Sequence, residues 1–196
     1  MKALILAGGK NRRFGDLKSF IKINSRSIID TNIELLRNIF TEVILSTNDP
    51  EKYFYLGVPM VGDIMKDKGP MSGILTTLML NDVQTVFVTA CDMPFIQVDL
   101  IHFMKRRWTS SFHAAIPVFQ GNPQPLFGIY SKKVAAVMET SIRNNMNSLR
   151  DFLHEINVLY IREKEVKEYD PEGKSFININ TEDDFRKEIG GDICLV

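Results

Sequence analysis

The protein has 196 residues, of which 44% are hydrophobic, and this size and composition predict one domain with a substantial core. Its 24 lysine and arginine residues are balanced by 24 aspartate and glutamate residues, so the chain has no excess positive charge with which to hold a nucleic acid or an anionic membrane. Two cysteines, Cys91 and Cys194, provide neither a disulfide framework nor a zinc-binding spacing. With no signal-like or membrane-spanning segment in view, we expect a cytoplasmic protein.

Short apolar segments alternate with longer segments of helical periodicity, a pattern typical of parallel strands joined by crossover helices. Apolar residues at helical spacing predict helices over residues 28–39 and 74–80. We expect an α/β fold, a three-layer α/β/α domain with a mostly parallel central sheet, over residues 1–190, followed by a short tail at 191–196. The segments that predict buried strands are residues 3–7, 43–46, 58–61, 86–89 and 114–118.

The periodicity is weaker in the last third of the chain. A strand is predicted at residues 125–130, followed by helices at 132–142 and 149–154. The charge-rich segment 162–174 contains a proline and a glycine, and it predicts an exposed loop or sheet edge. A last helix is predicted to begin after Asn180, where a capping residue precedes an acidic turn.

A glycine-rich loop follows the first predicted strand. Gly8 and Gly9 give the backbone freedom to approach an anion, and the loop sits where open α/β sheets bind their ligands, at the carboxyl end of a strand. A solvated glycine turn is the plain alternative, but nearby cations favour phosphate binding. The spacing matches neither a P-loop nor a dinucleotide-binding fingerprint. The cations that come after the glycines are Lys10, Arg12, Arg13 and Lys18.

Two further predicted strands end in an aspartate, Asp63 and Asp92. In a parallel sheet both carboxylates would lie at the same edge as the glycine loop. Mg²⁺ needs oxygen ligands, and one or two carboxylates together with phosphate oxygens satisfy it, so Asp92 is the first candidate for a metal ligand. Alternatively, Asp92 caps the helix expected near Gln97 or belongs to a turn. Asp63 could instead accept hydrogen bonds from Lys66, Lys68 or loop amides.

Two other segments could approach a ligand. The segment from Lys68 to Gly73 leads into the helix predicted at 74–80, where Gly73 and the free amides of the first turn could approach an anion, although a plain helix start after a proline-containing turn explains the same residues. Asn178 and Asn180 flank a single residue, so in an extended segment both amides would point the same way. Isolated asparagines are otherwise common in turns.

Taken in order, these motifs resemble the MobA family of molybdenum cofactor guanylyltransferases, which have a nucleotide-diphospho-sugar-transferase type of fold. The first motif alone is shared by several sugar-nucleotide and cytidylyl transferases, whereas the ordered set is much more specific. The resemblance covers nearly the whole chain. It is carried by residues 6–18, Asn48, Asp63, residues 69–73, residues 91–94 and residues 176–181.

The resemblance implies transfer of GMP from GTP to the phosphate of molybdopterin, with release of pyrophosphate. It implies that Mg²⁺ binds Asp92. For such a transfer we expect Arg13 and Lys18 to stabilise charge on the phosphates and Gly9 to belong to the phosphate-binding loop. Asn178 and Asn180 would lie toward the pterin. The GTP contacts that it implies are Leu6, Ala7, Gly8, Lys18, Asn48, Asp63 and Asp92.

The sequence also leaves other functions open. One alternative is a related cytidylyltransferase or sugar-1-phosphate nucleotidyltransferase, since the glycine loop is shared among them. Another is a non-catalytic nucleotide or cofactor carrier that delivers the cofactor to an apo-enzyme. The charged segment 164–168 could contact such a partner, or it could be a solvated loop, and molybdoenzyme maturation proteins are further candidate partners. The sequence departs from the family at residues 144–148, which lack the basic side chains expected near the pterin phosphate and have only Arg143 and Arg150 nearby.

Overall fold

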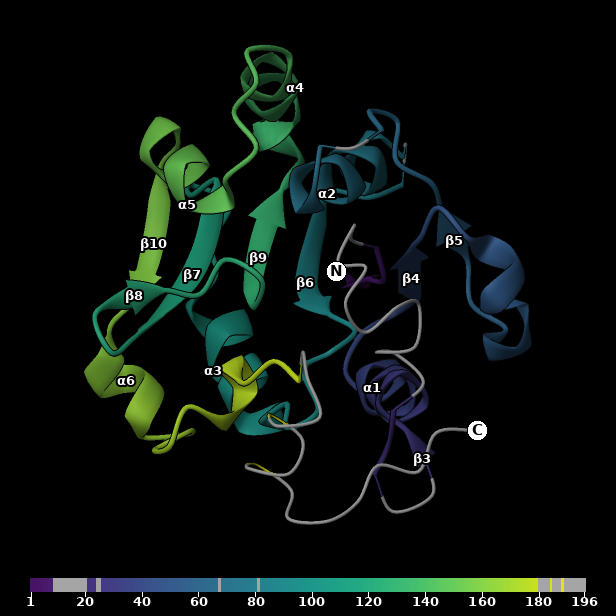
Figure 1. The fold of residues 1–196 in the computed structure, drawn as a ribbon. Helices are drawn as coiled ribbons and strands as arrows, with labels where there is room; N and C mark the ends of the chain where they lie inside the picture. The colour runs from purple at the N-terminus through teal and green to yellow at the C-terminus, as the bar shows by residue number, and fades with distance from the viewer. Residues whose placement is uncertain are drawn as a thin grey trace.

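The described chain forms three layers, with an eight-stranded sheet between two layers of helices (Figure 1). The computed structural model describes residues 1–8, 21–23, 26–66, 68–80, 82–179, 184 and 188. Outside the described residues lie most of the predicted last helix, the tail 191–196, and four predicted site residues, namely Gly9, Arg13, Lys18 and Asn180.

The strands of the sheet have the order β10, β7, β9, β6, β1, β4, β5. β1 pairs in parallel with β4 and β6, β4 pairs in parallel with β5, and β10 pairs in parallel with β7. β9 is antiparallel to both β6 and β7. Because the other neighbouring strands in this order pair in parallel, the prediction of a mostly parallel sheet is confirmed. The bounds are β1 Lys2–Leu6, β4 Val43–Ser46, β5 Met60–Val61, β6 Thr85–Ala90, β7 Ala114–Phe119, β9 Gly128–Ser131 and β10 Val158–Ile161. Shorter strands are β8 (Asn122–Pro123), which pairs with β7, and the antiparallel pair β2 (Lys22–Ile23) and β3 (Arg26–Ser27).

Helices cover both faces of the sheet (Figure 1). Because side chains alternate along a strand, Ala3 and Ile5 of β1 join one core while Leu4 and Leu6 join the other. Buried strands with two apolar faces are therefore continuous apolar segments, as the sequence shows. The first core lies under α1 (Ile28–Arg37), α3 (Val98–Arg107) and α6 (Glu163–Lys167), and the second under α2 (Pro70–Met79), α4 (Ala135–Arg143) and α5 (Leu149–Phe152).

The chain reverses its direction across the sheet at β1. From β1 it passes through α1 to β4 on one side, and from β5 it returns through α2 to β6 on the other side. The two connections lie on opposite faces, which separates the loops after the strands and opens a crevice at the carboxyl ends of the central strands. The fold thus predicts a ligand site at the end of β1.

Several element predictions need correction. Of residues 58–61 only Met60–Val61 form a strand, and the strand expected at 125–130 begins at Gly128. The loop or edge expected over 162–174 is wrong in part, because α6 forms there and buries Val166 completely. Its five residues contain a single apolar side chain, too few to show a period. β10 was not predicted; it forms because β7 offers a partner along its edge.

Candidate functional site

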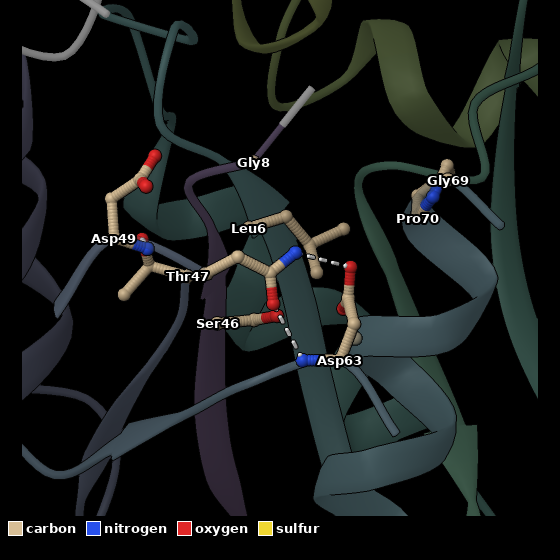
Figure 2. Close-up of a pocket in the computed structure, with 10 residues that line it drawn as sticks. Leu6, Gly8, Ser46, Thr47, Asp49, Asp63, Gly69 and Pro70 are labelled. Carbon is tan, nitrogen blue, oxygen red and sulfur yellow. Dashed lines mark hydrogen bonds between the residues drawn. The ribbon is translucent and has the colours of Figure 1, made fainter. Parts of the chain in front are cut away.

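A pocket of about 370 Å³ opens at the carboxyl ends of β1 and β4. Figure 2 shows Thr47 and Asp49 on one side of it and Gly69 and Pro70, at the start of α2, on the other. The pocket therefore occupies the crevice that the reversal at β1 creates. Its lining residues are Leu6, Gly8, Ser46, Thr47, Asn48, Asp49, Asp63, Gly69, Pro70 and Gly73.

The first turn of α2 reaches the floor of the pocket because residue 73 is glycine. A Cβ atom at Gly73 would lie 2.4 Å from Ser46 Oγ and 2.9 Å from Leu6 Cδ2, closer than real Cβ contacts. Both neighbours belong to the ends of buried strands. The glycine thus allows the helix to pack directly on β1 and β4, and the pocket takes its shape from this contact.

The start of α2 is built from Gly69 and Pro70. Gly69 has a φ of +65°, which residues with a side chain rarely adopt. Pro70 occupies the first helical position, where an amide hydrogen would have no partner within the helix. Because Gly69, Pro70 and Gly73 all line the pocket, the amino-terminal end of this helix faces it, and the helix dipole favours a negatively charged ligand there.

Asn48 and Asp63 form a doubly hydrogen-bonded pair in the pocket. The Asn48 Nδ2 group donates to Asp63 Oδ2 over 2.9 Å, and the Asp63 backbone amide donates to Asn48 Oδ1, also over 2.9 Å (Figure 2). The two residues come after β4 and β5, whose register pairs Ser46 with Val61. The parallel register therefore brings the amide and the carboxylate together, and the carboxylate is held in one orientation.

The segment after Asp63 is attached to α2 by two side-chain hydroxyls. Thr76 Oγ1 accepts a hydrogen bond from the Ile64 amide at 3.0 Å, and Ser72 Oγ accepts one from the Met65 amide at 3.1 Å. Ser72 is fully buried, whereas Ile64 is exposed. Consequently the loop that carries Asp63 is fixed to the same helix that forms the opposite wall of the pocket.

The wall near Gly69 also touches the layer of α4. Lys68 Nζ donates to Asn145 Oδ1 at 3.0 Å. Arg143, one of the cations considered for the acceptor side, forms an ion pair with Glu139 at 2.7 Å within α4. The loop after α4 therefore borders the start of α2.

Asp92 lies at the same edge of the sheet, directly after β6. The Cys91 amide donates to the Leu6 carbonyl at 3.0 Å, which places Asp92 beside the end of β1, although it is not among the residues that line the pocket. Helix α3 begins at Val98 with Gln97 at its cap, so Asp92 does not cap that helix.

Asn178 is brought next to Asp92 by a long-range contact. The backbone amide of Ile179 donates to the Asp92 carbonyl at 2.9 Å. The side-chain Oδ1 of Asn178 is buried and, within the described part of the chain, has no hydrogen-bond donor. Buried oxygens are normally hydrogen-bonded, so this atom points to a donor that a ligand could supply.

The structure brings four of the predicted nucleotide contacts into one pocket, namely Leu6, Gly8, Asn48 and Asp63. Ala7 lies between two of them but is buried, and its amide donates to the Ser46 carbonyl at 2.8 Å. The lining residues missed by sequence reasoning are Ser46, Thr47 and Asp49. They belong to the end of the second predicted strand or come directly after it, so the rule that ligands bind at carboxyl ends of parallel strands could have indicated them.

Two kinds of feature are absent from the described residues. Within the ranges that the structure describes, no group of three or more histidine, cysteine, aspartate or glutamate side chains is arranged to hold a metal ion. Helices long and apolar enough to cross a bilayer are likewise absent from the described part of the chain.

The sheet order, the reversal at β1 and the glycine-lined pocket at the strand ends define a protein with the α/β fold of nucleotidyltransferases. The family model described as the MobA-like NTP transferase domain matches residues 3–159. The chain belongs to this family, as the resemblance of the ordered motifs had indicated.

Known relatives agree with this assignment. A probable molybdenum cofactor guanylyltransferase from Peptoclostridium acidaminophilum is 34% identical, over 94% of this chain and 86% of the relative. The crystal structure of molybdopterin-guanine dinucleotide biosynthesis protein A from Archaeoglobus fulgidus is 26% identical and has a TM-score of 0.79, covering 96% of this chain and 97% of that one. The structure of 4-diphosphocytidyl-2C-methyl-D-erythritol synthase from Anaerococcus prevotii has a TM-score of 0.70 at 14% identity, covering 96% and 95%, and it shows a shared fold alone.

Proposed function

We propose that the protein transfers GMP from GTP to the phosphate of molybdopterin, releasing pyrophosphate and forming a guanine dinucleotide. The observation that carries this proposal is the Asn48–Asp63 pair, which presents an oriented carboxylate in the pocket at the carboxyl edge of the sheet. The names of the relatives support the same donor and acceptor.

The carboxylate of Asp63 suits a guanine base. An ionised carboxylate only accepts hydrogen bonds, and guanine offers two adjacent donors, N1–H and the 2-amino group. Cytosine and adenine each have an amino group but lack this adjacent pair. A base held by Asp63 would extend its triphosphate toward Gly8 and the start of α2, because both line the same pocket.

The phosphates would bind where the helix dipole and the glycine loop favour negative charge. Gly8 is exposed, and a Cβ atom there would meet nothing within 4 Å, so the backbone leaves room for a phosphate. We assign charge neutralisation to Arg13 and Lys18 and backbone contacts to Gly9.

Asp92 is the proposed ligand of a magnesium ion. A single carboxylate at the edge of the sheet fits a cation that keeps several waters and takes phosphate oxygens for the remainder. When bound, the ion would neutralise charge on the triphosphate oxygens. Asp92 adjoins the end of β1 through the Cys91–Leu6 hydrogen bond, and it would thus hold the ion on the phosphate side of the pocket.

The reaction requires little proton transfer. The second pKa of a phosphate monoester is about 6, so the attacking oxygen of molybdopterin is already ionised at neutral pH. A bond forms between this oxygen and the α-phosphorus of GTP, and the bond from that phosphorus to pyrophosphate breaks. The protein contributes position and charge stabilisation. Asn178 and Asn180 would hold the pterin, for which the buried Oδ1 of Asn178 offers an acceptor.

The test is a pyrophosphate-release assay with each nucleoside triphosphate in turn, together with Mg²⁺ and molybdopterin. We expect release with GTP and formation of the guanine dinucleotide. Transfer from CTP in place of GTP would reject the guanylyl donor. Tight GTP binding without any pyrophosphate release would identify a carrier rather than an enzyme.

A further inference from the structure

The loop that carries Asp63 is more strongly fixed than its exposure requires. Four side-chain hydrogen bonds attach its three consecutive residues: two between Asp63 and Asn48, one from Ile64 to Thr76 and one from Met65 to Ser72. Ile64 is 56% exposed, whereas Met65 is partly buried and packs against the second core. The hydrogen bonds add to this packing, and the two with Asn48 act directly on the Asp63 backbone and carboxylate.

We propose that Ser72 and Thr76 are positioning residues that set the base selectivity of the pocket by holding the Asp63 loop against α2. The inference rests on the proposed function in one respect, namely that Asp63 contacts the base of the donor nucleotide. It goes beyond that function because neither hydroxyl needs to touch the nucleotide.

The two hydroxyls are arranged to receive consecutive amides. Ser72 and Thr76 are four residues apart, so they lie one above the other on the same face of α2. Thr76 Oγ1 donates its own hydrogen to the Ser72 carbonyl at 2.9 Å, which leaves its lone pairs for the Ile64 amide. This local bond within α2 orients the hydroxyl so that its oxygen can accept from the Ile64 amide.

The position of α2 links this attachment to the pocket. Gly73, the residue after Ser72, packs on the ends of β1 and β4, while Asn48 extends from the end of β4. Asp63 is thus hydrogen-bonded to Asn48, after the end of β4, and the two residues that follow Asp63 are hydrogen-bonded to α2. The loop of the carboxylate is therefore attached to the helix whose start would bind the phosphates.

Loss of one hydroxyl should weaken recognition of the base and leave binding of the phosphates unchanged. In a Thr76→Val variant the shape of the side chain is kept, but the Ile64 amide turns to water and the carboxylate gains freedom. Ordering it again on binding would raise KM for the preferred triphosphate by about three- to tenfold, the equivalent of one hydrogen bond. The value of kcat should stay near that of the wild type, because the reacting groups are unchanged.

The experiment compares matched variants of α2. Thr76→Val and Ser72→Ala each remove an acceptor, and Thr76→Ser keeps the hydroxyl. Thr77→Val is the control, because the buried Thr77 hydroxyl donates to the Gly73 carbonyl at 2.9 Å within the helix. For each protein, kcat and KM are measured with every nucleoside triphosphate, and inhibition by inorganic tripolyphosphate reports on phosphate binding without a base.

We expect Thr76→Val and Ser72→Ala to raise KM for the preferred triphosphate and to narrow its advantage over the others, with unchanged inhibition by tripolyphosphate. Thr76→Ser and Thr77→Val should behave as the wild type. Unchanged selectivity in Thr76→Val and Ser72→Ala, or an equal loss in Thr77→Val, overturns the inference.

The outcome for the inference can be separated from that for the guanylyl proposal. If the wild type prefers a triphosphate other than GTP, the guanylyl proposal fails, and the selectivity of the variants for that other base still decides the role of the hydroxyls. If the wild type uses every triphosphate equally or binds none, the pocket selects no base, and both the guanylyl proposal and the inference about the hydroxyls are rejected.

Discussion

Replacing Gly73 by alanine should change the shape of the pocket at its floor, where α2 packs on the ends of β1 and β4. The added methyl group would lie 2.4 Å from Ser46 Oγ, 3.1 Å from Ser46 Cβ and 2.9 Å from Leu6 Cδ2. The serine hydroxyl can rotate away, but its Cβ and the leucine methyl belong to residues of the buried strands β4 and β1. We therefore expect the first turn of α2 to move outward, taking Gly69 and the loop of Asp63 with it.

Two opposing terms set the effect on stability. Overpacking a well-packed site costs about 1–3 kcal/mol. Alanine is a better helix former than glycine by about 1 kcal/mol, which offsets part of that cost. The net loss in the free energy of unfolding should be about 0–2 kcal/mol, small enough for the variant to fold. Activity is more sensitive, because misplaced binding groups reduce rates by about tenfold or more.

The assay combines urea unfolding with measurement of kcat and KM for GTP in the Gly73→Ala variant. Gly62→Ala is a matched control, because a Cβ atom there would have its nearest neighbours at 3.7 and 3.8 Å, an ordinary contact distance. The control should change the free energy of unfolding by less than about 0.5 kcal/mol. A Gly73→Ala protein with wild-type stability, wild-type kcat and wild-type KM would refute the idea that this close contact shapes the pocket.

The remaining predictions concern the metal, a turn and a surface ion pair. Asp92→Ala should lower pyrophosphate release by about 10² or more at every Mg²⁺ concentration while circular dichroism stays unchanged; a fully active variant would reject the metal assignment. Gly173→Ala should unfold at lower urea concentration, because φ is +68° and the new methyl group would lie 2.2 Å from the Phe119 ring. The hydrogen bond from Lys2 lowers the pKa of Asp82, so NMR titration of Lys2→Met should show that pKa returning upward. A depressed carboxyl pKa contributes its full stability above the unfolded-state pKa and loses it as the pH falls through the folded-state pKa. The free energies of unfolding of wild type and Lys2→Met should therefore differ at neutral pH and converge at low pH. An Asp82 pKa that does not move in the variant would show that the ion pair is absent in solution.

Much of the fold could be predicted from local patterns in the sequence. The segments that became β1, β4, β6 and β7 are short and mostly apolar because strands buried on both faces favour apolar residues on both sides. Elements that depend on a partner were harder to predict. β10 forms along the edge of β7, and α6 has a single buried apolar residue, Val166, so neither has a strong period of its own.

The glycine loop and Asp63 could be found from sequence because each comes after a predicted strand, and parallel strands place the loops at their carboxyl ends along one edge of the sheet. Asn48 was indicated by the family resemblance. That the amide of Asn48 bonds the carboxylate of Asp63 depends on the register of β4 and β5. The bonds from Ser72 and Thr76 to the loop depend on how α2 packs across Gly73. The hydrogen-bond partners of a side-chain hydroxyl cannot be inferred from the periodicity of the sequence. Only the tertiary structure therefore decided which groups hold the carboxylate and its loop in place.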